Sequence, residues 1–325
     1  MTFVCAIVGP TAVGKSELAE RVAQRVDAEI VSADSMQIYC SMDVGTAKPP
    51  DHSSPVTYHC IDLVEPGTPY SAALYQAEAR SAIKEIVARG RLPILCGGTG
   101  LYVRAALDDW VFPGGSVESP ERAALEQEAV VLGADRLHKR LAELDPPSAD
   151  LIHPANVRRT IRALEMVAQG QSYADQAAGF QRRTSVYDAR FIGLTMAREL
   201  LYDRIDQRVD DMLAAGLLSE VTSLLAAGFR DALTAAQAIG YKELVPVIED
   251  HAPLDEAVEA IKRATRRYAK RQLTWFKSDP RIQWIDMTDA DLDSVLEDVV
   301  RLVESKGPAV TTGVPAPKTW RLDHC

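Results

Sequence analysis

The stretch Phe3-Val-Cys-Ala-Ile-Val-Gly-Pro-Thr-Ala-Val-Gly-Lys-Ser-Glu-Leu-Ala19 decides how the rest of the chain is interpreted. Residues 3–8 are apolar and rich in β-branched side chains, which predicts a short buried strand. Residues 9–16 match G-x-x-x-x-G-K-[ST] at every fixed position. An amphipathic helix follows, with Leu18, Ala19, Val22 and Val26 on one side. Strand, glycine loop and helix, in this order, are the context that the motif requires, so we predict a phosphate-binding site here.

Several groups of this loop can bind a phosphate. Successive backbone N–H groups form a concavity for anions, and the N-terminus of the helix adds a partial positive charge. Lys15 is expected to reach the terminal phosphates, and the hydroxyl of Ser16 can bind Mg²⁺. The predicted phosphate-binding residues are Gly9, Pro10, Thr11, Ala12, Val13, Gly14, Lys15 and Ser16.

Composition limits the classes of protein that the chain can belong to. The 325 residues, 47% of them hydrophobic, suggest about two domains, or one core with a large insertion. The sequence predicts no membrane span and no signal peptide, because no apolar run is long enough. The five cysteines lack metal-type spacing, and we expect free thiols in a reducing cytoplasm. A net charge of −10 argues against indiscriminate nucleic-acid binding but leaves room for a local basic surface.

Two further strands are predicted to end in polar residues. Residues 29–34 form a second strand that ends in Asp34, where an α/β sheet places its ligands. Asp34 could contact a ligand there or could order Mg²⁺. Alternatively, it could be a turn residue or a helix cap. A fourth strand, 91–96, runs into a glycine turn at 97–102, where Thr99 offers a hydroxyl if the strands are neighbours; a plain tight turn is the alternative. A third strand is predicted at 59–64, and Lys48, in the loop before it, is interpreted as a solvated charge.

The middle of the chain is predicted to be a helical insertion. A boundary is expected at residues 112–116, followed by helices to about residue 171, a loop over 171–185 and a return to strand at 187–194. Arg158, Arg159 and Arg162 fall near one helix face, which favours phosphate contact over a merely solvated surface only modestly. A helix from residue 198 places Arg204 and Arg208 on one face, where salt bridges to neighbouring aspartates are an alternative to ligand binding.

The last predicted long helix, 254–277, reverses the acidic balance of the chain. It carries seven basic residues against two glutamates, with Tyr268, Trp275 and Phe276 interleaved. Basic stripes with interleaved aromatic residues are typical of protein surfaces that bind a nucleic-acid backbone. A last edge strand is expected at 282–285, and the segment 305–325 is too poor in core residues to order itself.

Seven of these stretches together resemble the tRNA dimethylallyltransferases, the tRNA isopentenyltransferase family, and cover roughly residues 3–290. Their order is that of the family, and the absence of the zinc-finger region of some eukaryotic members points to the bacterial type. The stretches are Gly-Pro-Thr-Ala-Val-Gly-Lys-Ser (9–16), Ser-Ala-Asp-Ser-Met-Gln-Ile-Tyr (32–39), Gly-Thr-Ala-Lys-Pro (45–49), Gly-Gly-Thr-Gly-Leu-Tyr (97–102), Arg-Arg-Thr-Ile-Arg-Ala-Leu-Glu (158–165), Ala-Ile-Gly-Tyr-Lys-Glu (238–243) and Thr-Arg-Arg-Tyr-Ala-Lys-Arg-Gln-Leu-Thr-Trp-Phe (265–276).

The resemblance implies an α/β fold in which a P-loop NTPase-like parallel sheet carries a mostly helical insertion and C-terminal helices. The expected divisions are 1–115 for the first part of the core, 116–185 for the tRNA-contacting insertion, 186–304 for the rest of the core with the basic helices, and 305–325 for a disordered tail. The implied reaction transfers a dimethylallyl group from dimethylallyl diphosphate to the exocyclic amine of the adenosine 3′ of the anticodon. A cytoplasmic monomer that uses Mg²⁺, bound through Ser16, is expected.

The resemblance also implies roles for individual residues. Asp34 accepts a proton from the adenine amine, and Lys15 and Arg204 neutralise the diphosphate that leaves. Thr99 is placed with them in the catalytic set. The residues implied to contact tRNA are Asp34, Ser35, Met36, Gln37, Thr99, Arg122, Arg158, Arg159, Arg162, Arg266 and Lys270.

Three other functions remain open at this point. A small-molecule or nucleoside kinase would use the same loop for ATP, although the fourth strand ends in residues 96–98 with no acid for the metal of a nucleotide hydrolase. An RNA-binding protein without catalytic activity would need only the basic helices. A plant-type adenylate prenyltransferase would share the core but would have no use for the basic stretches at 158–162 and 262–277.

Overall fold

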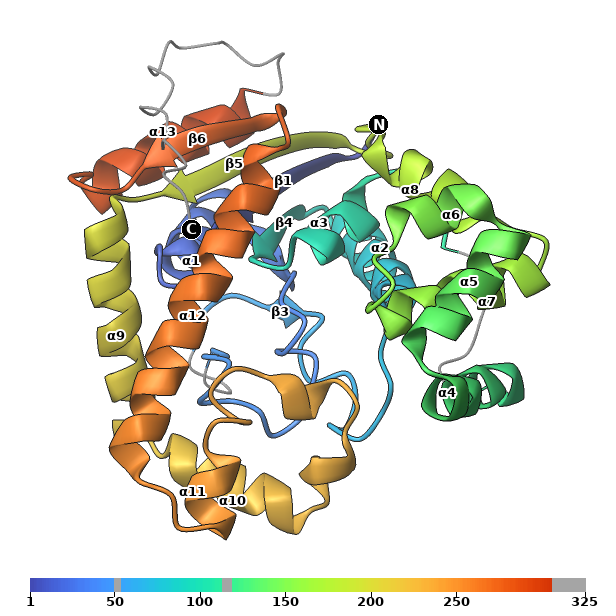
Figure 1. The fold of residues 1–325 in the computed structure, drawn as a ribbon. Coiled ribbons are helices and arrows are strands. Elements are labelled where there is room, and N and C mark those ends of the chain that lie inside the picture. Colours follow the sequence, from blue (N-terminus) through green and yellow to red (C-terminus); the bar gives the residue numbers. More distant parts are fainter. Residues whose placement is uncertain (50–53, 113–118, 306–325) are drawn as a thin grey trace. The chain divides into compact units, whose positions relative to one another are not determined.

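The computed structural model describes residues 1–49, 54–112 and 119–305. Its centre is a six-stranded sheet in the order β3-β2-β4-β1-β5-β6, and every pair of neighbouring strands is parallel (Figure 1). The predicted α/β fold with a parallel sheet is therefore confirmed. The strands are β1 (Phe3–Val8), β2 (Ala28–Ser32), β3 (Tyr58–His59), β4 (Leu92–Gly97), β5 (Asp188–Thr195) and β6 (Ile282–Asp286).

Helices connect these strands and follow them. The α-helices are α1 (Lys15–Val26), α2 (Ala72–Ala88), α3 (Gly100–Leu107), α4 (Pro120–Leu132), α5 (Ala134–Leu144), α6 (Pro146–Leu151), α7 (Val157–Ala168), α8 (Tyr173–Gln181), α9 (Arg198–Ala214), α10 (Leu217–Ala226), α11 (Val245–Glu249), α12 (Leu254–Lys277) and α13 (Leu292–Glu304). Short 3₁₀ helices occur at Phe229–Asp231 and Ala235–Gln237.

Both faces of the sheet are buried, which explains why its strands have no polar–apolar alternation. Cys5 and Ile7 of β1 pack in one cluster with α1 and α13, through residues such as Leu18 and Val299. The intervening Ala6 is equally buried but outside that cluster, so it faces the other side of the sheet. The central strands are therefore enclosed, and the ends of β1, β2 and β4 hold the loops of the candidate site in fixed register.

The chain forms two compact units. One comprises residues 1–107 together with the chain after residue 186, and the other comprises 108–186. The second unit has its own core of residues from α4 to α7, including Leu137, Leu141 and Ile161. Each unit is described by itself below.

The helical unit corrects one prediction. Residues 171–185 were expected to form a loop, but 173–181 form α8. Its N-cap is Ser172, whose hydroxyl accepts hydrogen bonds from the backbone N–H groups of Ala174 and Asp175. The Ser172 hydroxyl also donates to the carboxylate of Asp145, at 2.9 Å, which ties the start of α8 to the start of α6.

The loop region around β3 corrects two more predictions. The expected strand at 59–64 is only Tyr58–His59, because Cys60 and Asp62 have left-handed φ angles of 61° and 50°. Lys48 is buried and not solvated. Its ammonium donates to the carbonyl of Tyr39 at 2.6 Å and to carboxylates of Asp43 and Asp62 at 2.8 and 2.5 Å.

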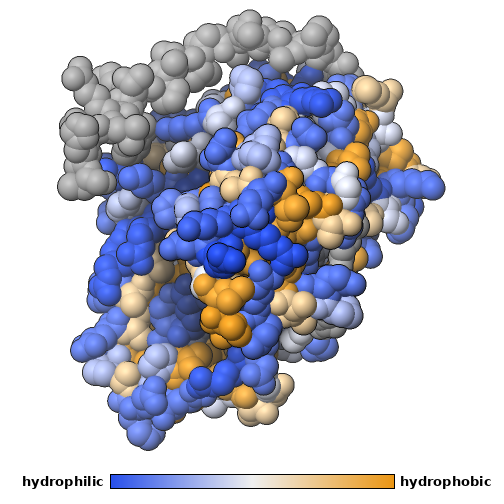
Figure 2. Space-filling model, turned by 45° about the vertical axis from the view of Figure 1, so that its right-hand side comes forward, coloured by the Kyte–Doolittle hydropathy of each residue, from blue (hydrophilic) through white to orange (hydrophobic). Residues whose placement is uncertain are grey.

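The face of the protein drawn in Figure 2 is largely polar. Hydrophilic side chains predominate on it and hydrophobic ones gather in smaller areas. Within 1–49, 54–112 and 119–305, no helix has the length and apolar character to cross a membrane. The predicted tail beyond Ser305 and most of the predicted boundary at 112–116 lie outside the described residues.

Candidate active site

The loop after β1 is shaped by backbone conformations that few residues adopt. Gly9 has a φ of 148°, and a Cβ there would lie 2.6 Å from the carbonyl oxygen of Leu194 in β5. Ala12 has a left-handed φ of 65°, and Gly14, the N-cap of α1, has a φ of 100°. These turns bring the loop across the N-terminus of α1, which begins at Lys15.

Lys15 and Ser16 line a cavity of about 210 Å³ at this loop. The Lys15 ammonium donates to the carbonyl of Pro10 at 2.6 Å, and burial lowers the pKa of this group to about 8. Ser16 is exposed to the cavity at the first turn of α1. A cation, a hydroxyl and a helix N-terminus therefore converge on one small cavity, as phosphate binding requires.

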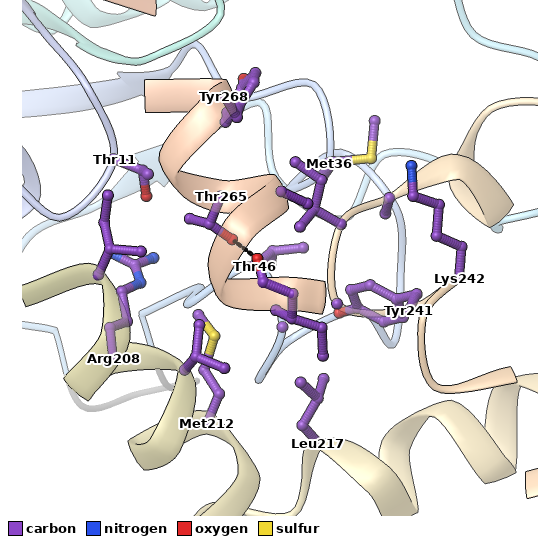
Figure 3. A pocket seen from close by; sticks show the side chains of 18 of the residues that line it. Thr11, Met36, Thr46, Arg208, Met212, Leu217, Tyr241, Lys242, Thr265 and Tyr268 are labelled. Atoms are coloured by element: carbon purple, nitrogen blue, oxygen red, sulfur yellow. Dashed lines mark hydrogen bonds between the residues drawn. The ribbon is translucent and has the colours of Figure 1, made fainter. Parts of the chain in front are cut away.

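A larger cavity, of about 380 Å³, adjoins the first. Five residues line both cavities: Thr11, Asp34, Thr46, Arg208 and Tyr268. Figure 3 shows Arg208 and Met212 projecting from α9, and Thr265 and Tyr268 from α12, around the larger cavity. One part of its wall is apolar (Ile205, Val209, Met212, Leu217, Ile261 and Ala264) and another is basic (Lys242, Arg267 and Arg271). Such a wall suits a ligand with an apolar part and an anionic part.

Asp34 lies between the two cavities, two residues beyond the end of β2. Its Oδ1 accepts a hydrogen bond from the backbone N–H of Met36 at 2.9 Å, which is the turn role that the sequence left open. Its other oxygen has no hydrogen bond to any described residue, and the side chain lines both cavities. The carboxylate is therefore held in place by one oxygen, and the second oxygen is available to a ligand.

Thr99 and Asp34 come together because β2 and β4 are neighbours. The Thr99 hydroxyl accepts from the backbone N–H of Ser35 at 3.1 Å and donates to the hydroxyl of Ser35 at 3.3 Å. Thr99 lines neither cavity, whereas Ser35 and Met36 line the larger one. Thr99 thus supports the 34–36 turn from behind.

The side chain of Gln37, in contrast, forms hydrogen bonds with other residues of the protein. Its side-chain oxygen accepts from the hydroxyl of Ser32 at 2.7 Å, and its amide nitrogen donates to the carbonyl of Thr46 at 3.1 Å. It lines the smaller cavity while it ties β2 to the 42–48 loop.

The structure brings Arg208, not the predicted Arg204, to the cavities. Arg204 is exposed and lines neither of them. Arg208, one turn further along α9, lines both, and burial lowers the pKa of its guanidinium below the ordinary value. Arg208 has no ion pair with any described residue, so the salt-bridge alternative does not apply to it.

Sequence reasoning missed two polar side chains that hold the site together. Glu220 of α10 accepts hydrogen bonds from three successive backbone N–H groups, those of residues 43–45, at 2.9, 2.7 and 3.2 Å. It also accepts from the hydroxyl of Tyr241 at 2.6 Å, and a Cβ at Gly45 would lie 2.5 Å from the ring of that tyrosine. Gln272 of α12 is the second. The sequence signal for Glu220 was indirect, because the 45–49 and 238–243 stretches that it contacts belong to the family resemblance. Gln272 lies in another stretch of that resemblance, 265–276.

Six of the seven basic residues of α12 divide into two groups. Lys262 and Arg266 form ion pairs with Asp210 and Asp206 of the adjacent α9, at 2.7 and 2.5 Å. Arg266, predicted to contact tRNA, is thus paired with an acid of the protein itself. The second group is exposed and forms no salt bridge with a described residue: Arg263, Arg267, Lys270 and Arg271. Trp275, on the same helix, is 44% exposed, whereas Phe276 is buried.

The arginines of the helical unit divide in a similar way. Arg122 and Arg162 lie at the buried carboxylate of Glu165, at 3.2 and 3.4 Å. Arg158 and Arg159, at the start of α7, are exposed. Within this unit, the exposed pair is the part of the predicted stretch that is accessible to a polyanion.

A metal ion would depend on few protein ligands here. The described residues contain no group of three or more His, Cys, Asp or Glu side chains that could hold a metal. The smaller cavity does present the Ser16 hydroxyl and the Asp34 carboxylate together. Hard oxygen donors in small number fit Mg²⁺, which keeps several waters and takes the rest of its ligands from phosphates.

Comparison with known proteins is consistent with this site. A family model described as IPP transferase matches residues 37–279, and one described as isopentenyl transferase matches residues 2–57. A tRNA dimethylallyltransferase of Geobacillus kaustophilus is 48% identical over 93% of this chain and 96% of its own length. One of Carboxydothermus hydrogenoformans is 48% identical over 90% of this chain and 95% of its own.

Solved structures agree. The tRNA isopentenylpyrophosphate transferase of Bacillus halodurans has a TM-score of 0.70 at 40% identity, covering 94% of this chain and 96% of its own. A eukaryotic dimethylallyltransferase acting on tRNA has a TM-score of 0.80 at 28% identity, covering 94% and 81%. The resemblance found in the sequence is confirmed: this chain belongs to the IPP transferase family, that of the tRNA dimethylallyltransferases.

Proposed function

We propose that this enzyme transfers a dimethylallyl group from dimethylallyl diphosphate to the exocyclic amine of the adenosine 3′ of the anticodon in tRNA, with release of diphosphate. One observation carries the proposal: Asp34, which has one carboxylate oxygen without a hydrogen bond to a described residue, lines both the phosphate-type cavity and the larger cavity. A proton acceptor between an anion site and a mixed apolar and basic site is what a transfer between two such substrates needs.

The diphosphate is proposed to bind at the smaller cavity. Thr11, Lys15 and Ser16, from the loop before α1 and the first turn of that helix, line this cavity together with Arg208. Allylic C–O cleavage builds negative charge on the diphosphate oxygens, so preorganised cations lower the barrier to it. Arg208 takes the role that the sequence had suggested for Arg204. Mg²⁺, held through Ser16 and the diphosphate, would supply further positive charge.

The adenine is proposed to enter the larger cavity, beside Ser35 and Met36. Its exocyclic amine is a weak nucleophile because the lone pair is delocalised into the ring. Asp34 accepts the proton of this amine as the new C–N bond forms, a general-base role typically worth about 10²–10⁴ in rate. A base in a stacked anticodon loop cannot reach this carboxylate, so the adenosine must be flipped out.

The rest of the tRNA is proposed to contact exposed cations. On α12 these are Arg263, Arg267, Lys270 and Arg271, and in the helical unit they are Arg158 and Arg159. Arg122, Arg162 and Arg266 were also predicted to contact tRNA; their ion pairs to Glu165 and Asp206 suit them better to holding the helices that carry the exposed residues. We propose that the enzyme acts as a monomer.

The kinase alternative is not favoured. Relatives that cover 90% or more of the chain are named tRNA dimethylallyltransferase. A kinase would still use the loop before α1 for ATP. The two functions therefore differ in the phosphorylated substrate and in the acceptor.

The test is incubation of the purified protein with unmodified tRNA, Mg²⁺ and dimethylallyl diphosphate, followed by mass spectrometry of the nucleosides. We expect one adenosine per substrate tRNA to gain one five-carbon prenyl unit. The Asp34→Ala variant and a reaction with ATP in place of the allylic diphosphate are the controls. Phosphoryl transfer from ATP, or no prenylated adenosine with any tRNA in a total tRNA pool, would contradict the proposal.

A further inference from the structure

Gln272 lies on the inward side of α12 and connects three distant parts of the chain. Its side chain is 5% exposed. The side-chain oxygen accepts a hydrogen bond from the backbone N–H of Thr11 at 2.8 Å, and the amide nitrogen donates to the carbonyl of Gly98 at 3.0 Å. The first partner belongs to the phosphate loop and the second to the loop after β4.

The packing around this amide leaves it little freedom. A Cβ at position 98 would lie 2.1 Å from the Gln272 amide nitrogen, so only glycine admits the side chain. Because β1 and β4 are adjacent, the two loops leave the sheet side by side, and the amide spans them. A buried amide that uses both its donor and its acceptor in this way stabilises one arrangement of its partners, and the loss of either bond leaves a buried group unpaired.

We infer that Gln272 is a positioning residue for the diphosphate cradle. By engaging the N–H of Thr11 it fixes the turn that leads to Lys15 and Ser16, which line the smaller cavity, and by engaging Gly98 it sets that loop against the neighbouring one. The inference rests on the proposed binding of the diphosphate at this loop. Gln272 also lines the smaller cavity itself, one turn along α12 from Tyr268.

The variant Gln272→Glu tests this inference through pH. A protonated carboxyl has the same shape as the amide: its carbonyl oxygen can accept from Thr11 and its hydroxyl can donate to Gly98. A carboxylate cannot donate and would face the Gly98 carbonyl with a negative charge. Burial raises the pKa of such a carboxyl, so the functional, protonated form is expected to be lost as pH rises through a value above the ordinary one for glutamate.

The measurement is the affinity for inorganic diphosphate with Mg²⁺, by calorimetry, across pH for wild type and Gln272→Glu. At high pH we expect the variant to bind roughly tenfold to a hundredfold more weakly, the range for lost buried hydrogen bonds. On acidification the ratio of the two affinities should return toward one. Gln272→Ala should bind weakly at every pH, and all three proteins should bind tRNA alike. Thr274→Ala, an exposed change on the same helix, is the matched control.

Two results would overturn the inference. One is a ratio between Gln272→Glu and wild type that does not change with pH; the other is a normal diphosphate affinity in Gln272→Ala. If Gln272→Glu fails to fold, the Gln272→Ala affinity alone decides. Failure of the proposed function shows differently, since wild-type protein would then bind no diphosphate, or would bind it without transferring a prenyl group to tRNA.

Discussion

The cations at the smaller cavity and those on the outer side of α12 are held in different ways. Lys15 and Arg208 are partly enclosed, and burial lowers the pKa of each. Neither has a carboxylate ion-pair partner among the described residues. The exposed residues of α12 that line neither cavity, such as Arg263 and Lys270, stand in solvent with their charges hydrated.

This difference assigns different tasks to the two sets of charges. An enclosed charge acts in a medium of low effective dielectric, so a single residue can change the energy of a transition state strongly. An exposed charge is screened by salt, contributes little alone and acts as one of several. We therefore expect chemistry to depend on the enclosed group and tRNA affinity to depend on the exposed group.

The largest effect is expected for Asp34→Ala, which removes the acid that faces the enclosed cations. Turnover should fall by about two or more orders of magnitude, as for loss of a general base, while tRNA affinity stays nearly normal. Single-turnover prenylation and filter binding of tRNA measure the two quantities. Near-normal turnover with a raised Mg²⁺ requirement would show instead that Asp34 serves the metal.

A smaller but still large effect is expected for Arg208→Ala, with Arg204→Ala as its matched control. Arg208→Ala should lower kcat/KM for dimethylallyl diphosphate by about 10–100-fold, because it removes an enclosed cation from the leaving group. Arg204→Ala should keep kcat/KM within about twofold of the wild-type value. Steady-state kinetics at saturating tRNA make the comparison. The reverse order of effects would restore the assignment made from the sequence and remove Arg208 from the mechanism.

These two arginines show where sequence reasoning stops. Both lie on one helix four residues apart, so a helical pattern places them on the same side. Which one enters the cavity depends on how α9 packs against α12, and that contact joins segments about 60 residues apart. The loop at 9–16 was predictable in detail because its strand, glycines and helix are consecutive in the chain.

Gln272 and α8 illustrate two other limits. No local pattern indicates that Gln272 contacts Thr11, 261 positions away in sequence. The helix α8 did have a local signal, Ser172 as a cap with Asp175 three residues on, which approximates a capping box. This cap alone did not predict a helix, because α8 is short and has no buried residues that would give a helical pattern of apolar positions.

The pKa of Lys15 predicts a pH dependence of diphosphate binding. With a pKa of about 8 in the free protein, the ammonium loses its charge as pH rises above that value. Affinity for diphosphate should then fall by up to about tenfold per pH unit, whereas below pH 8 this group causes no change. Calorimetry from pH 6.5 to about 9.5 measures it. Lys15→Arg should lack the transition, since a guanidinium stays charged, and a transition that persists in Lys15→Arg would assign it to another group.

The smallest effect per residue is expected on α12, and it separates the exposed cations from the paired ones on a single helix. Each phosphate contact releases counterions, so the logarithm of tRNA affinity should fall with the logarithm of salt concentration by about 0.7–0.9 per neutralised phosphate. Arg263 and Lys270 are exposed and line neither cavity. Replacing both by alanine should weaken tRNA binding several-fold and reduce this slope by the contribution of roughly two phosphates.

Arg266→Ala is the matched control from the same helix. The Arg266 guanidinium forms an ion pair with Asp206. Removal of this side chain should therefore leave the salt slope unchanged and lower thermal stability instead. Dimethylallyl diphosphate affinity should be the same in all these proteins, because the enclosed cations are untouched. Superimposable salt curves for wild type and the Arg263/Lys270 double variant would mean that tRNA contacts the enzyme elsewhere. Exposure would then be no guide to which cations bind RNA, because the outer side of α12 would be a solvated surface like any other.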